Sequence, residues 1–285
     1  MVRRLTTITI VLILVAAVAV VAGRIEHFSK EIEAEGAKKV DVVIDLAAGE
    51  FYITTKDMAQ VATVEVEYDS RRIECVVEYN VHGSTGELLL ESALRRKRNI
   101  DTEENRWEVV LSDRYPMTLE MEVGACDAEI DLGGIPLTEL MLEVGAASGE
   151  IDFSEPNPER LGEIDIEAGA ASVAIMNIGN ANFEQFSFEG GAGSFELDFR
   201  GDYKDEAEIS IEIGLGSAEI ILPRDIPVRV ETGDPGWFST VDFHNDDLDE
   251  VDDGVYESDD FEDADVRIYL DLEVGLGSID IYFKR

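Results

Sequence analysis

The sequence has few positive charges for its length. It contains 63 Asp and Glu residues against 23 Lys and Arg, which gives a formal net charge of -40. Nucleic-acid backbones and anionic lipid surfaces both require clustered cationic side chains on the protein that binds them. The composition therefore argues against nucleic acid as a partner and favours positive ions or cationic polymers. A salt-rich environment would also explain the acidity without any specific ligand.

Cysteine and histidine are also scarce. With only Cys75 and Cys126, the chain has no disulfide framework and no CxxC metal motif. An oxidising compartment would allow one disulfide between them. The alternative is that Cys126 is a small turn residue, because related repeats carry Ala or Gly at that place. The histidines His27, His82 and His244 lie in different regions and none is paired with a nucleophile.

Only one long apolar run is present. Leu5–Ala22 carries no charge, follows two arginines and ends at Gly23. A run of this length can span a bilayer when tilted, and the preceding arginines predict that everything after it lies outside the cytoplasm. Ala17-Val18-Ala19 would suit signal-peptide cleavage. We expect residues 1–23 to be a signal anchor of a single-pass cytoplasmic-membrane protein, or a signal peptide if the chain is secreted.

After residue 40 the chain shows no helical periodicity and instead repeats one pattern. Each copy has apolar positions around an acid, a Gly-Ala or Gly-Leu turn, and a second alternating segment. The copies are LEMEVGACDAEIDL, LMLEVGAASGEIDF, IDIEAGAASVAIMN, FSFEGGAGSFELDF, ISIEIGLGSAEIIL and LDLEVGLGSIDIYF, with a weaker VVIDLAAGEFYITT near residue 42. The turn glycines of the first five, Gly124, Gly145, Gly169, Gly191 and Gly214, are 21, 24, 22 and 23 residues apart. Such a period is typical of a solenoid.

Alternation within each copy predicts half-buried strands. In the second copy, Leu142 and Val144 face one side before the turn, and Ile151 and Phe153 face it afterwards. We expect Gly at the turn to supply a backbone conformation that other residues adopt only at a cost. One copy cannot bury its own apolar face, but stacked copies form a continuous core. The predicted fold is an all-β solenoid, resembling a β-helix, with coils of roughly 22 residues.

Three regions depart from the period. Residues 24–39 are charged and predict a short stalk, and a helix would be compatible with this segment. Residues 56–118 contain irregular strands within the solenoid of residues 40–285, and include the basic run Arg95–Arg98. Residues 242–265 carry 13 acids and no Lys or Arg. We expect this last stretch to be an acidic, disordered loop between two coils.

The segment from Trp107 to Pro223 resembles the N-terminal part of toast-rack domains, most specifically in IGNANFE and GAGSFELDF. The final GLGSIDIYF resembles the closing repeat of that family and of the related putative-adhesin domains. The resemblance covers roughly residues 40–285 and implies a β-solenoid in a bacterial or archaeal envelope protein. The same domain type is similar to the soluble part of LiaF-like proteins, which act in cell-wall antibiotic stress responses. This chain lacks the several transmembrane helices of those proteins.

No catalytic constellation is evident in the sequence. Gly145–Gly149 is one residue off a nucleophile elbow and recurs in other copies as a turn. GLGS at Gly214 and Gly275 lacks the third glycine and the helix of a dinucleotide site. A polysaccharide lyase of solenoid type would need cationic residues along one face, which 7 lysines without alignment do not supply. We therefore predict no enzyme activity, no catalytic residues and no cofactor.

Two columns of carboxylates are predicted if the copies stack in register. Adjacent coils would lie about 4.8 Å apart, where two like charges repel by about 0.9 kcal/mol in bulk water. Salt, raised pKa values or bound Ca²⁺ or Mg²⁺ would offset this repulsion, and whether a metal binds is left open. The first column is Glu122, Glu143, Glu167, Glu189, Glu212 and Glu273, and the second is Glu129, Glu150, Glu196, Glu219 and Asp280.

These inferences favour a non-enzymatic, adhesin-like interaction module, tethered to the membrane and facing outward. Its partner would be an envelope polymer or a membrane protein. The alternative is a LiaF-like regulator of an envelope-stress sensor kinase, and a weaker one is a glycan-active enzyme. Whether the end coils self-associate is left open, because Leu270–Phe283 would form an apolar terminal coil without a cap.

Overall fold

The structure is a computed structural model that describes residues 25–95, 105–233, 239–244 and 248–285. The expected anchor or signal peptide, residues 1–23, lies outside them. Within the described residues no helix is long and apolar enough to cross a membrane. The strands are β1 (Ile25–Ile32), β2 (Lys39–Lys56), β3 (Ala62–Asp69), β4 (Ile73–His82), β5 (Thr85–Leu94), β6 (Asn105–Ser112), β7 (Met117–Asp131), β8 (Leu137–Asp152), β9 (Leu161–Met176), β10 (Phe183–Asp198), β11 (Ala207–Pro223), β12 (Val228–Thr232), β13 (Ser239–Phe243), β14 (Asp249–Asp252), β15 (Val255–Glu257) and β16 (Ile268–Lys284), with 3-10 helices η2 (Ile178–Ala181) and η3 (Phe261–Asp263).

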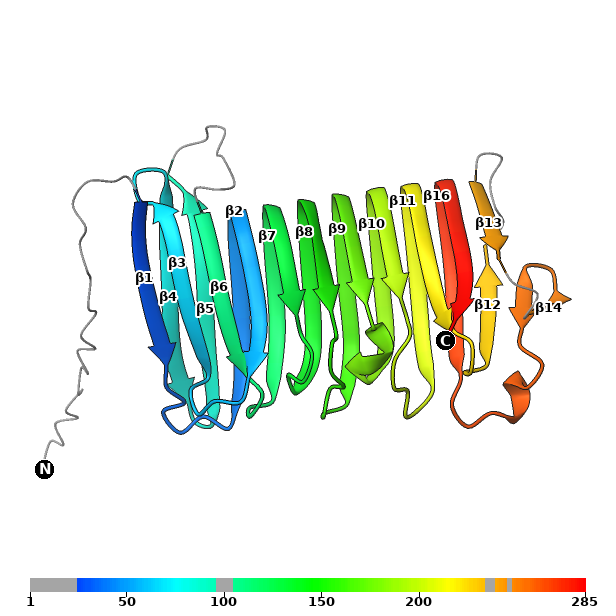
Figure 1. Cartoon of the computed structure of the whole chain (residues 1–285), viewed down its shortest axis with the longest axis horizontal. Coiled ribbons are helices and arrows are strands. Elements are labelled where there is room, and N and C mark those ends of the chain that lie inside the picture. The colour runs from blue at the N-terminus through cyan, green and yellow to red at the C-terminus, as the bar shows by residue number, and fades with distance from the viewer. Residues whose placement is uncertain (1–24, 96–104, 234–238, 245–247) are drawn as a thin grey trace, which may run out of the picture.

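Seven long strands form the body of the molecule. β2, β7, β8, β9, β10, β11 and β16 have 15 to 18 residues each. They lie side by side in that order, parallel and in register (Figure 1). We call the part of each strand before its corner glycine the first half-coil and the part after it the second half-coil. The all-β class and the in-register stacking of the repeats are confirmed.

Alternate residues of both half-coils meet in one core. In β10, Phe188 on the first half-coil and Phe195 on the second contact each other edge-on, with ring centroids 5.1 Å apart at 70°. Burying one such side chain contributes roughly 1.5–3 kcal/mol, and every coil repeats the burial. The residues predicted to face inward in the second copy are all buried: Leu142, Val144, Ile151 and Phe153.

The corner glycines have a different role from the predicted one. A Cβ on Gly145, Gly169 or Gly191 would lie 2.6 Å from the carbonyl oxygen of the corner glycine in the preceding coil. None of these three has a positive φ. Glycine is therefore needed because stacked corners approach too closely for a side chain, and the expected special turn conformation is wrong here.

The N-terminal end replaces the predicted stalk by strand β1, which pairs antiparallel with β3. The charged residues of β1 hid its alternation, because Lys30 turns inward and its Nζ donates to the carbonyl oxygen of Val77 on β4 at 2.8 Å. Among the strands that the structure describes, β4 pairs only with β5, so this contact covers a backbone acceptor at a sheet edge. β5 and β6 each run parallel to one half of β2, and together they act as its neighbouring coil.

The C-terminal end departs from chain order. β16 lies between β11 on one side and β12 and β13 on the other. The segment Leu270–Phe283 is therefore not a terminal coil without a cap, and that prediction is wrong. In the acidic stretch 242–265, the described residues include β14 and β15, which continue the sheet beyond β12, so the stretch is not simply a loop. Tyr256 packs on Phe243 with ring centroids 4.6 Å apart, which covers the end of the core.

Cys75 and Cys126 are both free thiols. Cys75 is on β4 and Cys126 on β7, with β5 and β2 between them in the sheet order. Three strand spacings amount to about 14 Å, which is beyond the Cα separation that a disulfide tolerates. In the basic run, Arg95 contacts Glu74 at 3.8 Å, and residues 96–98 lie outside the described part.

Candidate functional site

The first carboxylate column forms as predicted. Alternation in β8 turns Leu142 and Val144 inward and leaves Glu143 exposed between them. The register aligns the glutamates of successive coils directly. It also adds Asp45 and Glu91, which belong to a weak copy and to an irregular strand and which sequence reasoning therefore missed. Spaced by about 4.8 Å, the column forms a line of negative charge along the stack.

A trough runs beside this column. Its volume is about 440 Å³, and it exists because the adjacent corner residues are glycines without side chains. The trough is open to solvent. It suits an extended occupant that lies across several coils. Its lining includes Glu122, Glu143, Glu167, Glu189 and Glu212, with Gly124, Gly145, Gly169, Gly191 and Gly214.

The second carboxylate column is interrupted. Ala174 lies in register between Glu150 and Glu196, so the predicted run is divided into two parts. Towards the C-terminal end, Lys284 Nζ lies 3.3 Å from Glu219, and His244 Nε2 lies 2.6 Å from Asp280. These cationic or protonatable partners reduce the repulsion. Within the part of the chain that the structure describes, none of the glutamates predicted for the first column forms such an ion pair.

A column of hydroxyls lies beside the second carboxylate column. Serine follows five of the corner glycines by three residues, as in the recurring GAAS, GAGS and GLGS segments, and the register aligns these serines. In the coil of β7, Asp127 takes this place. Sequence analysis treated those segments only as turns and missed the column. A groove of about 480 Å³ borders it. The members are Ser148, Ser172, Ser194, Ser217 and Ser278.

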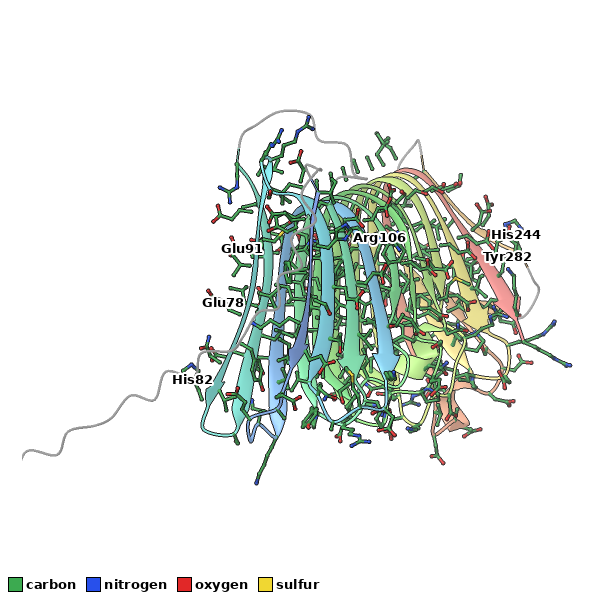
Figure 2. All side chains as sticks on the ribbon, turned by 60° about the vertical axis from the view of Figure 1, so that its left-hand side comes forward. Glu78, His82, Glu91, Arg106, His244 and Tyr282 are labelled. Carbon is green, nitrogen blue, oxygen red and sulfur yellow. The ribbon has the colours of Figure 1, made fainter. Side chains whose placement is uncertain are left out.

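Histidines do not gather into a site. His27 lies 3.4 Å from Glu67, and His82 lies 3.7 Å from Glu87. His244 also stacks on Tyr282, with ring centroids 4.3 Å apart and the planes 5° from parallel. His82 and His244 occupy opposite ends of the molecule (Figure 2). Among the residues that the structure describes, no three His, Cys, Asp or Glu side chains converge as a metal site would require.

Nucleophile chemistry finds little support in the geometry. The segment Gly145–Gly149 runs through the corner of β8, where Ser148 Oγ donates to Asp127 in the neighbouring coil. Burial raises the pKa of the Cys75 thiol to about 12 and that of Cys126 to about 11. Both thiols are therefore protonated at neutral pH, and a protonated thiol is a poor nucleophile.

Replacing Glu167 with glutamine should stabilise the protein. Glu167 has Glu143 on one side and Glu189 on the other, and removing its charge relieves two like-charge contacts. We expect a gain of about 1 kcal/mol in the free energy of unfolding at low salt. Concentrated NaCl should raise the stability of the original chain and shrink this difference. Urea unfolding at several NaCl concentrations measures both effects.

Glu120 supplies the matched control. Glu120 is exposed on β7 and faces the same side of the sheet as the first carboxylate column. Its neighbours in register are the uncharged Val43 and Met141. Glu120→Gln should change the stability by much less than Glu167→Gln. Equal effects of the two substitutions would show that total charge matters and that the column does not. If millimolar Ca²⁺ stabilised the chain beyond NaCl of equal ionic strength, salt screening alone would not explain how the column is tolerated.

Comparison with known proteins shows one family. A family model described as the N-terminal domain of toast_rack, DUF2154, matches residues 21–176 and 163–221. Among solved structures, a putative cell adhesion protein from Clostridium sporogenes ATCC 15579 is 19% identical with a TM-score of 0.49, covering 91% of this chain and 100% of that one. A putative adhesin from Bacteroides fragilis NCTC 9343 is 10% identical with a TM-score of 0.40, covering 90% and 97%. No curated protein matches the chain.

Proposed function

Because this chain belongs to the family of the N-terminal domain of toast_rack, we propose that it is a non-enzymatic interaction module that acts outside the cytoplasm. It would hold an extended partner, such as an envelope polymer or a surface protein, along its stack of coils. One observation carries this proposal. The outward glutamates of the first column repeat in register from coil to coil along the stack.

A periodic surface suits a periodic partner. Each coil presents the same kind of group at a spacing of about 4.8 Å, so a chain-like ligand can repeat the same contact many times. The troughs beside the columns are open to solvent, whereas small substrates are usually held in concave, largely apolar pockets. Weak contacts repeated along one ligand add up to strong attachment. The geometry therefore supports adhesion better than turnover.

Residues 1–23 would serve as the membrane anchor in this proposal. Strand β1 begins at Ile25, so no stalk separates the apolar segment from the first strand of the sheet. An uncleaved anchor would hold the N-terminal end of the stack close to the membrane, and the coils would extend away from it. If the segment is cleaved, the same module would be released.

Capture from cell envelopes tests the proposal. The tagged full-length chain, in detergent, is incubated with a solubilised envelope fraction, and the retained material is analysed for saccharides and proteins. Retention of an envelope polymer or surface protein that is recovered intact is the expected result. Cleavage of retained glycan would mean that the chain is an enzyme. Retention of a sensor kinase alone would favour the LiaF-like regulator and overturn the adhesive role.

A further inference from the structure

A third groove lies on the first half-coils, directly beside the first carboxylate column, because its floor residues come two positions before the glutamates of that column. Its floor is formed by Ser187 on β10 and Ser210 on β11, which are direct neighbours in register. Asp165 continues this column on one side and Asp271 on the other. The two short serine side chains lie between longer neighbours, and the groove they leave has a volume of about 550 Å³. From Asp165 to Asp271 the column spans three coil spacings, or about 14 Å.

One wall of the groove is a parallel column two residues earlier in each strand. It contains Gln185, Glu208 and Tyr269 in register, and Arg229 follows Tyr269 on β12. Gln185 Nε2 donates to Glu208 Oε2 at 3.3 Å. This wall therefore combines a planar amide, a carboxylate and an aromatic ring beside a floor of hydroxyls.

Tyr269 is held in place by two neighbours. The ring of Phe261 meets it edge-on, with centroids 5.1 Å apart at 85°. The guanidinium of Arg267 lies 5.4 Å from the ring centroid, and its Nε also donates to Glu206 at 2.8 Å. A tyrosine fixed in this way offers an apolar ring with a polar end, which fits the mixed surface of a sugar. Binding would then cost little side-chain ordering.

The charge of the groove selects its occupant. Its lining includes Glu163, Glu206, Glu208, Glu231 and Asp271, and the single cation Arg229 is already paired with Glu257 at 2.9 Å. Anionic polymers such as uronates or phosphate-rich chains would be repelled, and ammonium groups would be attracted. Hydroxyls, an amide and a fixed aromatic ring complement the rest of a sugar ring.

A peptide is a poorer fit than a glycan. The strands under the groove, β9, β10, β11, β16 and β12, are each paired on both sides. Their backbone groups are therefore used within the sheet, and no free edge is present there for an added peptide strand. An extended peptide would have to be held by its side chains alone.

We propose that this groove binds a short stretch of amino-sugar glycan, with its ammonium groups on the carboxylates and a sugar ring against Tyr269. The inference rests on the proposed role as an interaction module, because it names a ligand class for that module. The groove borders the first carboxylate column but has its own floor, two positions earlier in each strand.

Calorimetric titration of the full-length chain in detergent tests the assignment, with a glucosamine hexamer as the probe. At a pH of about 5.5 most exposed carboxylates are still ionised. The hexamer should bind, whereas the N-acetylated hexamer and hexagalacturonate should bind at least about tenfold more weakly. Equal binding of the N-acetylated hexamer, or equally tight binding of hexalysine, would overturn the proposal.

Substitutions locate the binding. Ser187→Arg combined with Ser210→Arg fills the floor and adds two positive charges, and Tyr269→Ala removes the platform. Each should weaken binding of the glucosamine hexamer by about tenfold or more, with circular dichroism used to confirm folding. The control is Ser29→Arg with Asn80→Arg, which adds the same charge at exposed positions of β1 and β4. If the control weakens binding as much, general charge attraction accounts for it and the groove is wrong.

The same variants separate this proposal from the broader one. If the Ser187→Arg, Ser210→Arg chain still captures envelope material as well as the original chain does, the groove assignment falls and the interaction role remains. If the original chain captures nothing from the envelope, the interaction role itself falls, whatever the titrations show.

Discussion

Substituting alanine for Gly169 should destabilise the protein by about 3 kcal/mol, the upper part of the range for overpacked sites. The new Cβ would lie 2.6 Å from the carbonyl oxygen of Gly145 and 3.5 Å from that of Val144. Both atoms belong to the backbone of the preceding coil, so no flexible side chain can move aside. Relief requires the two coils to separate at the corner, which weakens their ladder of hydrogen bonds. Urea unfolding followed by circular dichroism measures the loss.

Gly162 is the matched control, because it lies near the start of the same strand. A Cβ there would have only the carbonyl oxygen of Thr138 nearby, at 4.0 Å, and the residue has no positive φ. Gly162→Ala should therefore be neutral or slightly stabilising, by up to about 1 kcal/mol, because alanine restricts the unfolded chain. Similar unfolding free energies for the two variants would refute close corner packing as the reason for glycine.

The stacking register was predictable because it depends on local repetition. Copies such as those around Gly145 and Gly169 share their spacing from acid to corner, so one alignment places the alternating apolar residues, such as Leu142 and Ile166, inward. A shift by one residue would turn the apolar set towards solvent. The same alignment predicts the first carboxylate column, and the structure confirms it.

The ends of the stack were not predictable in this way. The last copy, around Gly275, is read from sequence as the last coil, yet β12 and β13 come earlier in the chain and lie beyond it. Position in sequence does not determine spatial order when a segment passes the end of the stack and returns. In β1 and β15 the alternation of apolar and polar residues is also hard to recognise, because acidic residues surround the few side chains that pack inward, such as Tyr256.

The glycan groove was hidden for a related reason. Ser187 and Ser210 belong to consecutive copies, but the residues that complete the site, Tyr269 and Asp271, are more than fifty positions further along the chain. They become neighbours only because β16 inserts beside β11. No spacing rule within one repeat contains this information, whereas the serine column recurs at a fixed distance from the corner glycine in five copies.

Removing the side chain of Arg200 is expected to destabilise the protein about as much as Gly169→Ala does. Asp198, at the end of β10, is 0% exposed. It accepts hydrogen bonds from Arg200 Nε at 2.9 Å and from the backbone N–H of Arg200 at 3.0 Å. Nη1 of Arg200 also donates to the carbonyl oxygen of Arg285 at 3.2 Å, which ties the end of the chain to β10. This pairing raises the pKa of Arg200, so the guanidinium keeps its charge at any relevant pH.

Arg200→Ala would leave the Asp198 carboxylate buried with only a backbone donor, and breaking one side of such a buried pair costs about 3 kcal/mol. Arg200→Lys should recover part of this loss, because an ammonium keeps the charge but cannot form the bidentate contact.

Arg160→Ala is the comparison: its pair with Asp205, at 3.5 Å, is largely in water, with side-chain exposures of 37% and 68%. That loss should stay below about 1 kcal/mol. Thermal unfolding of the three variants would rank them Arg200→Ala, Arg200→Lys, Arg160→Ala from largest to smallest loss. Equal losses for the two alanine variants would mean that the burial of Asp198 contributes nothing to the strength of its pairing.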